Sequence, residues 1–497
     1  MLSFNFILLI VYFVILNAAF AFQISLFSFI PDPLEDMFNA SFYRHYGSYL
    51  EGFGTATIWS ASTFIQKFGS IFGLLVLVKL LDTKGRKFGA VWLRIGMVFA
   101  VGILYLIAYF LPSFETFLLG EFIAGAGGQV KWAATVLFLS ECAPDQYRGM
   151  TVILVQFGDS LMHLVGQTID RPSLFGNSND WYLIVVITLL LALFSLTYLA
   201  WVPESPKFLA ENGRLTLAEN SIRFYHGKAT DIDTVMGRIQ EEVSTKNQLK
   251  GQSDNVSFKD IWRDESLKKV TLILLSLFLF FQVSTGAIEG LFFVRVHTMM
   301  GLTAETVMTI SSITKVISLP FYIFTAYCVE KMGRRPISLC SVSLSLVKTV
   351  VALTGQCIVQ FYGACTATQV IAIAGDGLNT MMMILGENQI VSLLCCEMTS
   401  PRARVRVMQT ISLMSMTAGM AFASLVPYAF NYFPPLPYFV LLILQPPVIV
   451  YIYRNLPETM GRPVSDIVED FTEAVRSRAP TRRTSLYSEE EKMPLLQ

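Results

Sequence analysis

Residues 82–87 read Asp82-Thr83-Lys84-Gly85-Arg86-Lys87, and residues 330–335 read Glu330-Lys331-Met332-Gly333-Arg334-Arg335. Both stretches hold an acidic residue, a glycine and an arginine at the same spacing, and the two glycines lie 248 residues apart. That separation is about half of the 497-residue chain. One such match means little alone, so its weight depends on whether other motifs repeat at a similar separation.

Two further motifs do repeat, in the same order along the chain. Glu141 and Arg148, seven residues apart, are matched 256 residues later by Glu397 and Arg404. The third pair consists of Pro203-Glu204-Ser205-Pro206 and Pro457-Glu458-Thr459, whose glutamates are 254 residues apart. Three ordered matches at nearly one offset indicate an internal duplication, and two parallel repeats around a midplane site are an architecture of secondary transporters.

The composition is that of a membrane protein. The chain is 53% hydrophobic and only 15% charged, whereas a soluble domain usually carries about 25% charged residues. A membrane helix needs about 20 mainly apolar residues. Twelve segments qualify: 4–28, 57–80, 89–111, 116–140, 150–168, 182–202, 269–294, 306–328, 336–356, 366–396, 404–430 and 435–455.

We therefore expect an all-α membrane protein of twelve transmembrane helices in two six-helix halves. The expected boundaries are 1–202 for the N-terminal half, 203–268 for a cytoplasmic linker with short helices, 269–456 for the C-terminal half and 457–497 for a cytoplasmic tail.

The distribution of Lys and Arg predicts the orientation in the lipid bilayer. Loops 81–88, 141–149, 329–336 and 397–406 hold ten of these residues, and the opposite loops hold three. The positive-inside rule then places both termini and the linker in the cytoplasm. Asn39-Ala40-Ser41 falls on the outer side, where Asn39 can accept an N-glycan.

Acidic and basic residues at the cytoplasmic helix ends have a physical logic. Arginine binds a carboxylate through two parallel hydrogen bonds, and pairs at a wet helix end can break and re-form. We interpret the repeated charges as a latch, with simple interfacial anchoring as the alternative. The predicted cytoplasmic gate consists of Asp82, Arg86, Glu141, Arg148, Glu204, Glu330, Arg334, Arg335, Glu397, Arg404 and Glu458.

These motifs resemble those of the sugar porters of the major facilitator superfamily, and the animal facilitative glucose transporters most closely. The resemblance rests on the stretches above, with Leu139-Ser140-Glu141-Cys142-Ala143-Pro144 and Leu456-Pro457-Glu458-Thr459-Met460-Gly461-Arg462, and covers about residues 20–470. It implies alternating access without ATP. It also implies two salt-bridge sets: Arg86, Glu141, Arg148 and Glu204 in the first half, and Arg334, Arg335, Glu397, Arg404 and Glu458 in the second.

By the same resemblance, the bound sugar is held by amide side chains and indoles. The positions that correspond in this chain are Gln156, Gln167, Gln282, Ser284, Glu289 and Ser318. Several depart from the family pattern, because Ser284, Glu289 and Ser318 replace amides and both indoles are missing. Gly120-Glu121-Phe122 also reverses a family arginine. Hydroxyl groups need paired donors and acceptors, so we expect glucose itself to be a poor substrate.

Ionisable residues inside the predicted helices leave the substrate class open. Lys131 and Asp159 fall at one depth on adjacent helices and are expected to pair, and Lys315, Lys348 and Asp376 fall near the midplane of the second half. Such residues are costly in lipid unless they are paired or hydrated. They fit structural pairs, and equally a charged substrate or proton coupling.

Three functions are consistent with these observations. We favour a facilitative transporter of a small polar, sugar-like solute; the first alternative is a proton-coupled or facilitative transporter of organic ions, and the second is a transport-dead nutrient sensor. An enzyme is not expected, because no nucleophile, metal or cofactor motif occurs. Zero net charge makes nucleic acid an improbable partner. Cys357 and Cys365 flank one outer loop, and unpaired thiols are favoured over a disulfide.

The C-terminal tail carries a sorting pattern. Glu491-Lys492-Met493-Pro494-Leu495-Leu496 has an acidic residue followed by two leucines, and a clathrin adaptor is the partner that such a motif binds. Glu491, Leu495 and Leu496 are the predicted sorting residues. We expect a multi-pass protein of the plasma membrane, of endosomes or lysosomes, or of both, although short strings of this kind also arise by chance.

Overall fold

The computed structural model describes residues 3–144, 147–227, 231–251, 257–385, 387–460, 462 and 464–476. Within that range some positions are described by backbone alone: 27, 148–150, 152–153, 156, 245–251, 291, 322–330, 383, 387–389, 401–402, 465 and 474–476. All regular secondary structure in the described part of the chain is helical. The predicted sorting residues Glu491, Leu495 and Leu496 lie outside the described residues.

The N-terminal half contains six long helical segments, with one extra helix between the first two. In chain order they are α1 (Phe4–Phe29), α2 (Pro31–Tyr46), α3 (Gly52–Phe72) continued by η1 (Gly73–Leu77) and α4 (Leu80–Lys84), η2 (Phe88–Leu93) with α5 (Arg94–Phe110), α6 (Phe114–Cys142), α7 (Arg148–Ile169) and α8 (Trp181–Leu199). The extra helix, α2, starts at Pro31, where the fixed φ of proline suits a first helical turn.

Four helices lie between the halves in the described part of the chain: α9 (Pro206–Glu211), α10 (Leu215–His226), α11 (Ile232–Gly251) and α12 (Phe258–Arg263). The C-terminal half then follows as α13 (Glu265–Gln282), α14 (Thr285–Met299), α15 (Ala304–Met332), α16 (Arg334–Tyr362), α17 (Thr366–Ile384), α18 (Glu387–Met398), α19 (Pro401–Tyr432) and α20 (Leu436–Asn455). The amphipathic helix α21 (Val464–Arg476) comes last and buries Ile467 and Phe471.

The helices follow the twelve segments expected from hydropathy. Within the described residues, eight helical stretches are long and apolar enough to cross a membrane by composition alone. The remaining four segments correspond to α7, α13 with α14, α15, and α17 with α18. Two of these four are interrupted, because α13 ends at Gln282 before α14 begins at Thr285, and α17 ends at Ile384 before α18 begins at Glu387.

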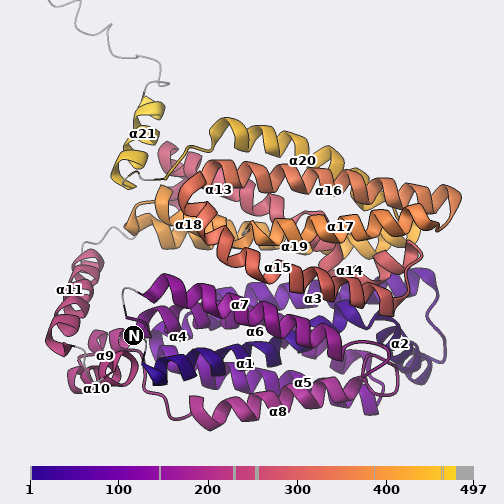
Figure 1. The fold of residues 1–497 in the computed structure, drawn as a ribbon, viewed down its shortest axis with the longest axis horizontal. Helices are drawn as coiled ribbons and strands as arrows, with labels where there is room; N and C mark the ends of the chain where they lie inside the picture. Colours follow the sequence, from indigo (N-terminus) through magenta and orange to yellow (C-terminus); the bar gives the residue numbers. More distant parts are fainter. Residues whose placement is uncertain are drawn as a thin grey trace, which may run out of the picture.

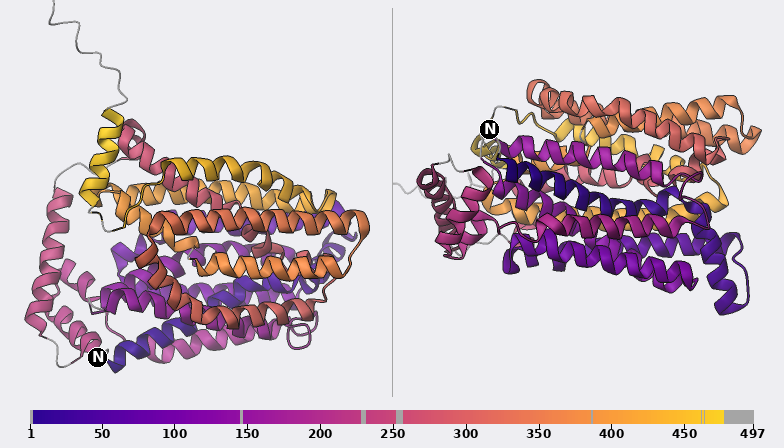
Figure 2. Two further views of the ribbon diagram at one scale, coloured as in Figure 1. Left: turned by 45° about the horizontal axis from the view of Figure 1, so that its top comes forward. Right: turned by 60° about the horizontal axis from the view of Figure 1, so that its bottom comes forward.

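The two halves lie side by side, with the N-terminal half below and the C-terminal half above in Figure 1. The N-terminus, the connecting helices α9–α11 and helix α21 gather at one end of the bundle, here named the linker end, and α2 lies at the opposite far end. The turned views in Figure 2 keep the same arrangement.

The hydrophobic core differs between these two ends. At the far end one continuous core draws on both halves and includes Trp59 and Val101 together with Phe292 and Ala423. At the linker end there are two separate cores, one around Phe13 and Phe138 in the N-terminal half and one around Leu277 and Val407 in the C-terminal half. The described apolar packing therefore joins the halves at the far end.

Candidate transport pathway and helix-end charges

The repeated charges of the N-terminal half meet at the linker end. Arg86 is almost fully buried at 3% exposure, and its Nε lies 3.3 Å from a carboxylate oxygen of Glu141. The guanidinium also donates to the Leu81 carbonyl oxygen at 2.9 Å and lies 3.3 Å from Asp82. Ser205 donates its hydroxyl to that same oxygen of Glu141. Arg86, Glu141, Glu204 and Ser205 are named the N-terminal brace below.

The C-terminal half repeats this arrangement. Arg334 lies 3.1 Å from a carboxylate oxygen of Glu397, and Thr459 donates its hydroxyl to the other oxygen. Arg334, Glu397, Glu458 and Thr459 are named the C-terminal brace. The Arg86–Glu141 pair and the Arg334–Glu397 pair each connect elements of one half, and Ser205 and Thr459 tie each pair to the segment that leaves that half.

Glu204 and Glu458 take a part that the charge pattern did not predict. The resemblance implied salt bridges to arginine, but the carboxylate of Glu204 accepts from the backbone N–H groups of Lys87 and Ser205, both at 2.8 Å. Glu458 accepts from the backbone N–H groups of Arg334 at 2.9 Å and Arg335 at 3.1 Å. The physical reason is that unsatisfied N–H groups at a helix start attract a carboxylate.

This carboxylate explains the glycine in each repeat. Gly85 and Gly333 have φ values of +115° and +91°, which side-chain-bearing residues rarely adopt. A Cβ atom at Gly85 would lie 2.4 Å from Glu204 Oε2, and one at Gly333 would lie 2.6 Å from Glu458 Oε2. Both glycines therefore allow the turn and the approach of the carboxylate.

The other predicted gate residues are placed as follows. Arg335 donates to the Tyr453 carbonyl oxygen at 2.9 Å, and Arg404 donates to the Cys396 carbonyl oxygen at 2.7 Å. These contacts hold backbone rather than the carboxylates that the resemblance implied. The side chains of Arg148 and Glu330 lie outside the described residues. Their gate role stays a prediction.

A polar network crosses the middle of the N-terminal half, buried at Asn17, Arg94 and Thr135 and partly exposed at Lys131 and Asp159. The expected pair forms, with Lys131 Nζ 3.6 Å from Asp159. Asp159 also accepts from the amide of Asn17 at 2.9 Å, and the Asn17 oxygen accepts from Arg94 at 2.5 Å. Arg94 donates to Thr135 as well, at 3.0 Å. Sequence reasoning missed Asn17 and Arg94, although an arginine in the apolar stretch 89–111 was a visible signal.

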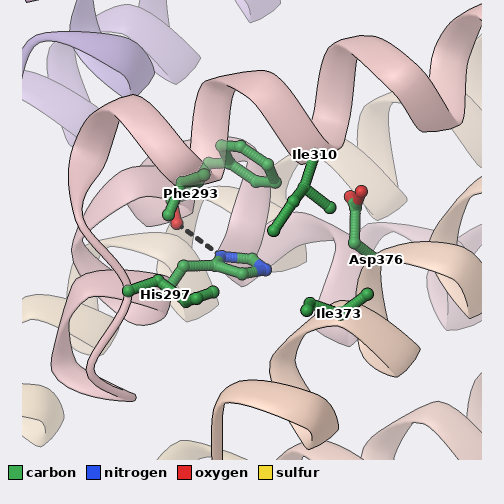
Figure 3. Close-up of a pocket in the computed structure, with 7 residues that line it drawn as sticks. Phe293, His297, Ile310, Ile373 and Asp376 are labelled. Atoms are coloured by element: carbon green, nitrogen blue, oxygen red, sulfur yellow. Dashed lines mark hydrogen bonds between the residues drawn. The ribbon is translucent and has the colours of Figure 1, made fainter.

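A second network lies in the C-terminal half. The fully buried Lys348 of α16 donates to Glu289 of α14 at 2.6 Å and to Asn379 of α17 at 2.7 Å. In both halves a buried cation from the third spanning segment therefore binds acceptors from the first segment. Toward the far end, His297 of α14 and Asp376 of α17 line a narrow pocket with Phe293, Ile310 and Ile373 (Figure 3).

The predicted substrate residues fall into two groups. Gln167 is buried at the junction of the halves and donates to Ser311 of α15 at 3.2 Å, and Gln282 packs near Gly419 of α19. Ser284 caps α14, with its hydroxyl oxygen accepting from the Ala287 N–H at 3.4 Å, and Ser318 donates to the Lys315 carbonyl oxygen. The last two therefore also have structural roles. The side chain of Gln156 lies outside the described residues.

Glu121, the residue that reverses a family arginine, has neutral partners. Gln66 donates to it at 2.7 Å and Tyr105 at 2.6 Å. The predicted glycan acceptor Asn39 lies on α2, and its side-chain oxygen accepts from the Leu50 N–H at 3.2 Å. Cys357 and Cys365 are free thiols, as the sequence favoured.

Polar contacts also connect the halves at the far end. Arg295 of α14 lies 2.8 Å from Glu35 of α2, and Arg171, after α7, lies 3.5 Å from Glu305 of α15. Ser60 of α3 donates to the Ser424 carbonyl oxygen at 2.6 Å. Both ion pairs that the described residues form between the halves therefore lie at the far end, where the shared core also joins the halves. These contacts are named the far-end seam.

Two parallel six-helix halves that meet around a polar middle define the chain as a transporter of the major facilitator fold. The family model described as "Sugar (and other) transporter" matches residues 9–471. The chain therefore belongs to the sugar (and other) transporter family.

Similar proteins and solved structures agree with this family assignment. The solute carrier family 2 facilitated glucose transporter member 5 of Bos taurus is 24% identical over 457 residues, which cover 87% of this chain and 85% of the relative. Member 3 of Gallus gallus is 22% identical over 427 residues, covering 86% of this chain and 83% of the relative. The inward-open xylose transporter of E. coli superposes with a TM-score of 0.71 at 17% identity, covering 95% of this chain and 99% of that one.

Proposed function

We propose that this protein moves small, neutral, polyhydroxylated solutes across a membrane by alternating access. The observation that carries the proposal is the combination of a closed far-end seam with two separate cores at the linker end. A transporter of this fold exchanges two such states by rocking one half against the other around a central site. The arrangement described here is then the state closed at the far end.

Two pairs of charges inside the bundle are satisfied without a charged solute. Lys131 pairs with Asp159, and Lys348 pairs with Glu289, so these four charges neutralise one another within their own halves. A site for an organic ion needs an ion of opposite sign that is left for the substrate. Because these pairs are internal, hydrogen-bonding groups such as Gln167 and Gln282 remain the best candidates to contact the solute.

We further propose that the linker end faces the cytoplasm. The support is the excess of Lys and Arg in loops at that end, which the positive-inside rule predicts. Asn39 then faces outside. Because the Ser41 hydroxyl is buried and accepts from the Phe114 N–H at 2.9 Å, a glycan at Asn39 has to be added before α2 packs. A mobility shift on glycosidase treatment, absent in Asn39→Gln, tests this orientation.

Counterflow in proteoliposomes tests transport itself. Vesicles preloaded with one unlabelled solute receive the same solute in labelled form, in turn D-glucose, D-fructose, D-xylose, myo-inositol and tetraethylammonium. We expect a transient label overshoot with at least one polyol or sugar and a weaker signal with glucose than with the best solute. Overshoot with tetraethylammonium alone would replace our substrate class by organic cations.

Matched glutamine variants locate the site. Gln167→Ala removes a buried amide at the junction of the halves and is expected to raise the apparent KM of the best solute about tenfold, equivalent to about 1.4 kcal/mol. Gln240→Ala, on the exposed face of α11, is the control and should leave KM unchanged. Equal KM values in the two variants would remove Gln167 from the site.

A nutrient sensor without transport predicts a different result. Such a protein would bind a solute of the panel, seen as a rise in thermal stability, yet give no overshoot with any of them.

The tail is tested separately: a protein tagged at the N-terminus and carrying Leu495→Ala and Leu496→Ala should move from endosomes to the cell surface. An unchanged distribution would remove the sorting role and the expected clathrin adaptor.

A further inference from the structure

The two halves carry a lysine at the same position of their second spanning segment. Lys67 lies 18 residues before Gly85, and Lys315 lies 18 residues before Gly333. Lys67 is also near the middle of the apolar stretch Gly52–Lys84, which is long enough to cross a membrane. A lysine near a helix end can extend its ammonium to the membrane surface, but a lysine at mid-span cannot. The charge of Lys67 therefore has to be compensated inside the bundle.

Lys67 lies on the face of α3 that packs against the other half. Ser60, seven residues earlier in α3, donates to the Ser424 carbonyl oxygen of α19. Seven residues make nearly two helical turns, so Lys67 and Ser60 share one face of α3. The preceding residue, Gln66, instead turns toward α6, where it donates to Glu121 at 2.7 Å. The Lys67 side chain therefore leaves α3 on the side of α19, at the junction of the halves.

The surroundings of the two lysines differ. The carboxylates of Asp170 and Asp376 are within electrostatic reach of the Lys315 ammonium. Lys67 has no ion pair, no hydrogen-bond partner and no charged side chain within electrostatic reach in the part of the chain that the structure describes. An ammonium without a counter-charge is strongly disfavoured away from bulk water. The repeat thus places a lysine in both halves, whereas the described carboxylates compensate only the lysine of the C-terminal half.

We infer that Lys67 binds a small monovalent anion, such as chloride or a carboxylate, at the junction of α3 and α19. An ammonium has three N–H donors and no acceptor, so a negatively charged group with lone pairs complements it. Lys67 is partly exposed, so a small ion can reach it. The bound anion supplies the charge that two carboxylates supply near Lys315. The inference goes beyond the proposed function, because it concerns a second ligand and does not depend on which solute is transported.

The anion site lies beside the proposed solute site. Lys67 is seven residues beyond the contact between Ser60 and Ser424, counted along α3. Gly419 is five residues from the same contact along α19, and the two helices run antiparallel, so both positions lie at about the same depth. Gln282, a proposed solute contact, packs against α19 at Gly419. An anion at Lys67 is therefore near the solute but is held by a different helix.

Thermal unfolding of the purified protein tests the site without any solute. At constant ionic strength, chloride replaces HEPES as the only anion in the buffer. We expect the melting temperature of wild type to rise by a few degrees and to saturate, because a ligand that binds only the folded state stabilises it. Lys67→Met should melt above wild type in HEPES, since it removes an uncompensated charge, and should not respond to chloride. The control Lys79→Met, at an exposed position just before α4, should respond like wild type.

Two results would overturn the inference: a wild-type melting temperature that does not change with chloride, which is also what a neutral Lys67 amine would give, or an equal response in Lys67→Met. Acetate and gluconate then identify the source of the anion through the part of the response that Lys67→Met loses. A free anion gives similar responses to chloride and acetate, whereas an acid group carried on a polyol gives a stronger response to gluconate.

Failure of this inference is separable from failure of the proposed function, because the melting experiment requires neither a solute nor transport. Overshoot in counterflow without a chloride response in wild type would remove the anion site and leave transport intact. A chloride response that is lost in Lys67→Met, without overshoot for any panel solute, would support the anion site and contradict the proposed transport.

Discussion

The N-terminal and C-terminal halves use the same parts at the linker end in different surroundings. In the N-terminal brace the side chains of Arg86 and Glu141 are 3% and 8% exposed, whereas in the C-terminal brace those of Arg334 and Glu397 are 16% and 22% exposed. The buried pair is desolvated, so each charge depends on its partner. The wetter pair is closer to a surface ion pair, which contributes little. Duplication thus preserved the geometry while burial changed the energetics.

The capping carboxylates of the two braces differ in the same way. Burial raises the pKa of Glu204 above its ordinary value of 4.5, despite hydrogen bonds from the Ser205 and Lys87 backbone. Burial also acts on Glu458, but four backbone N–H groups outweigh it and hold the pKa of Glu458 below 4.5. The surroundings therefore disfavour the ionised form of the capping glutamate in the N-terminal half and favour it in the C-terminal half.

The buried networks give the largest expected contrast. Glu289→Ala leaves the fully buried Lys348 without its carboxylate, and breaking a buried pair from one side costs about 3–5 kcal/mol. Asn17→Ala removes a neutral acceptor of Arg94 and should cost about 1–3 kcal/mol. Thermal unfolding of the purified proteins measures both. The double variant Glu289→Leu with Lys348→Met should recover most of the loss, and no recovery would show that the pair is not the source.

The braces come next. Arg86→Met leaves Glu141 charged and 8% exposed, so a loss of about 3 kcal/mol is expected, whereas Arg334→Met should lose about 1 kcal/mol. The two substitutions are chemically identical, so each controls for the other in one unfolding assay. Equal losses in the two halves would mean that burial does not separate the braces.

The repeated glycines compare the two halves through the effect of a single added Cβ atom. Gly85→Ala and Gly333→Ala each impose a left-handed conformation on alanine and bring its Cβ against a glutamate oxygen. A residue held in such a conformation costs about 1–3 kcal/mol. Both variants should lose a similar amount, because the two positions share φ and partner. Combining Gly85→Ala with Glu204→Ala should restore part of the loss if the carboxylate contact contributes.

The smallest expected effect is on the pH dependence of the free energy of unfolding. Because the pKa of Glu458 is lowered, its contribution to stability is present above pH 4.5 and is lost as pH falls through the folded-state pKa. For Glu204 the pKa is raised, so its shift opposes stability at neutral pH and this opposition is relieved as pH falls toward 4.5. Glu458→Gln should therefore cost more than Glu204→Gln at pH 7. The reverse order in unfolding curves would contradict the contrast in surroundings.

Sequence alone determined the parts of this protein that depend on pattern. Long apolar segments fix the membrane helices, because each segment satisfies its own backbone in lipid. The repeated motifs fixed the two halves and brought Arg86 to Glu141 and Arg334 to Glu397, and depth counting paired Lys131 with Asp159.

Only the tertiary structure decided what those helices place side by side. Glu204 and Glu458 were expected to meet arginine side chains, but they accept from open backbone N–H groups at the starts of η2 and α16. Asn17 and Arg94, 77 residues apart, become partners only once α1 packs against the start of α5. His297 and Asp376 share a pocket because α14 and α17 come together, and no local spacing in the chain encodes that contact.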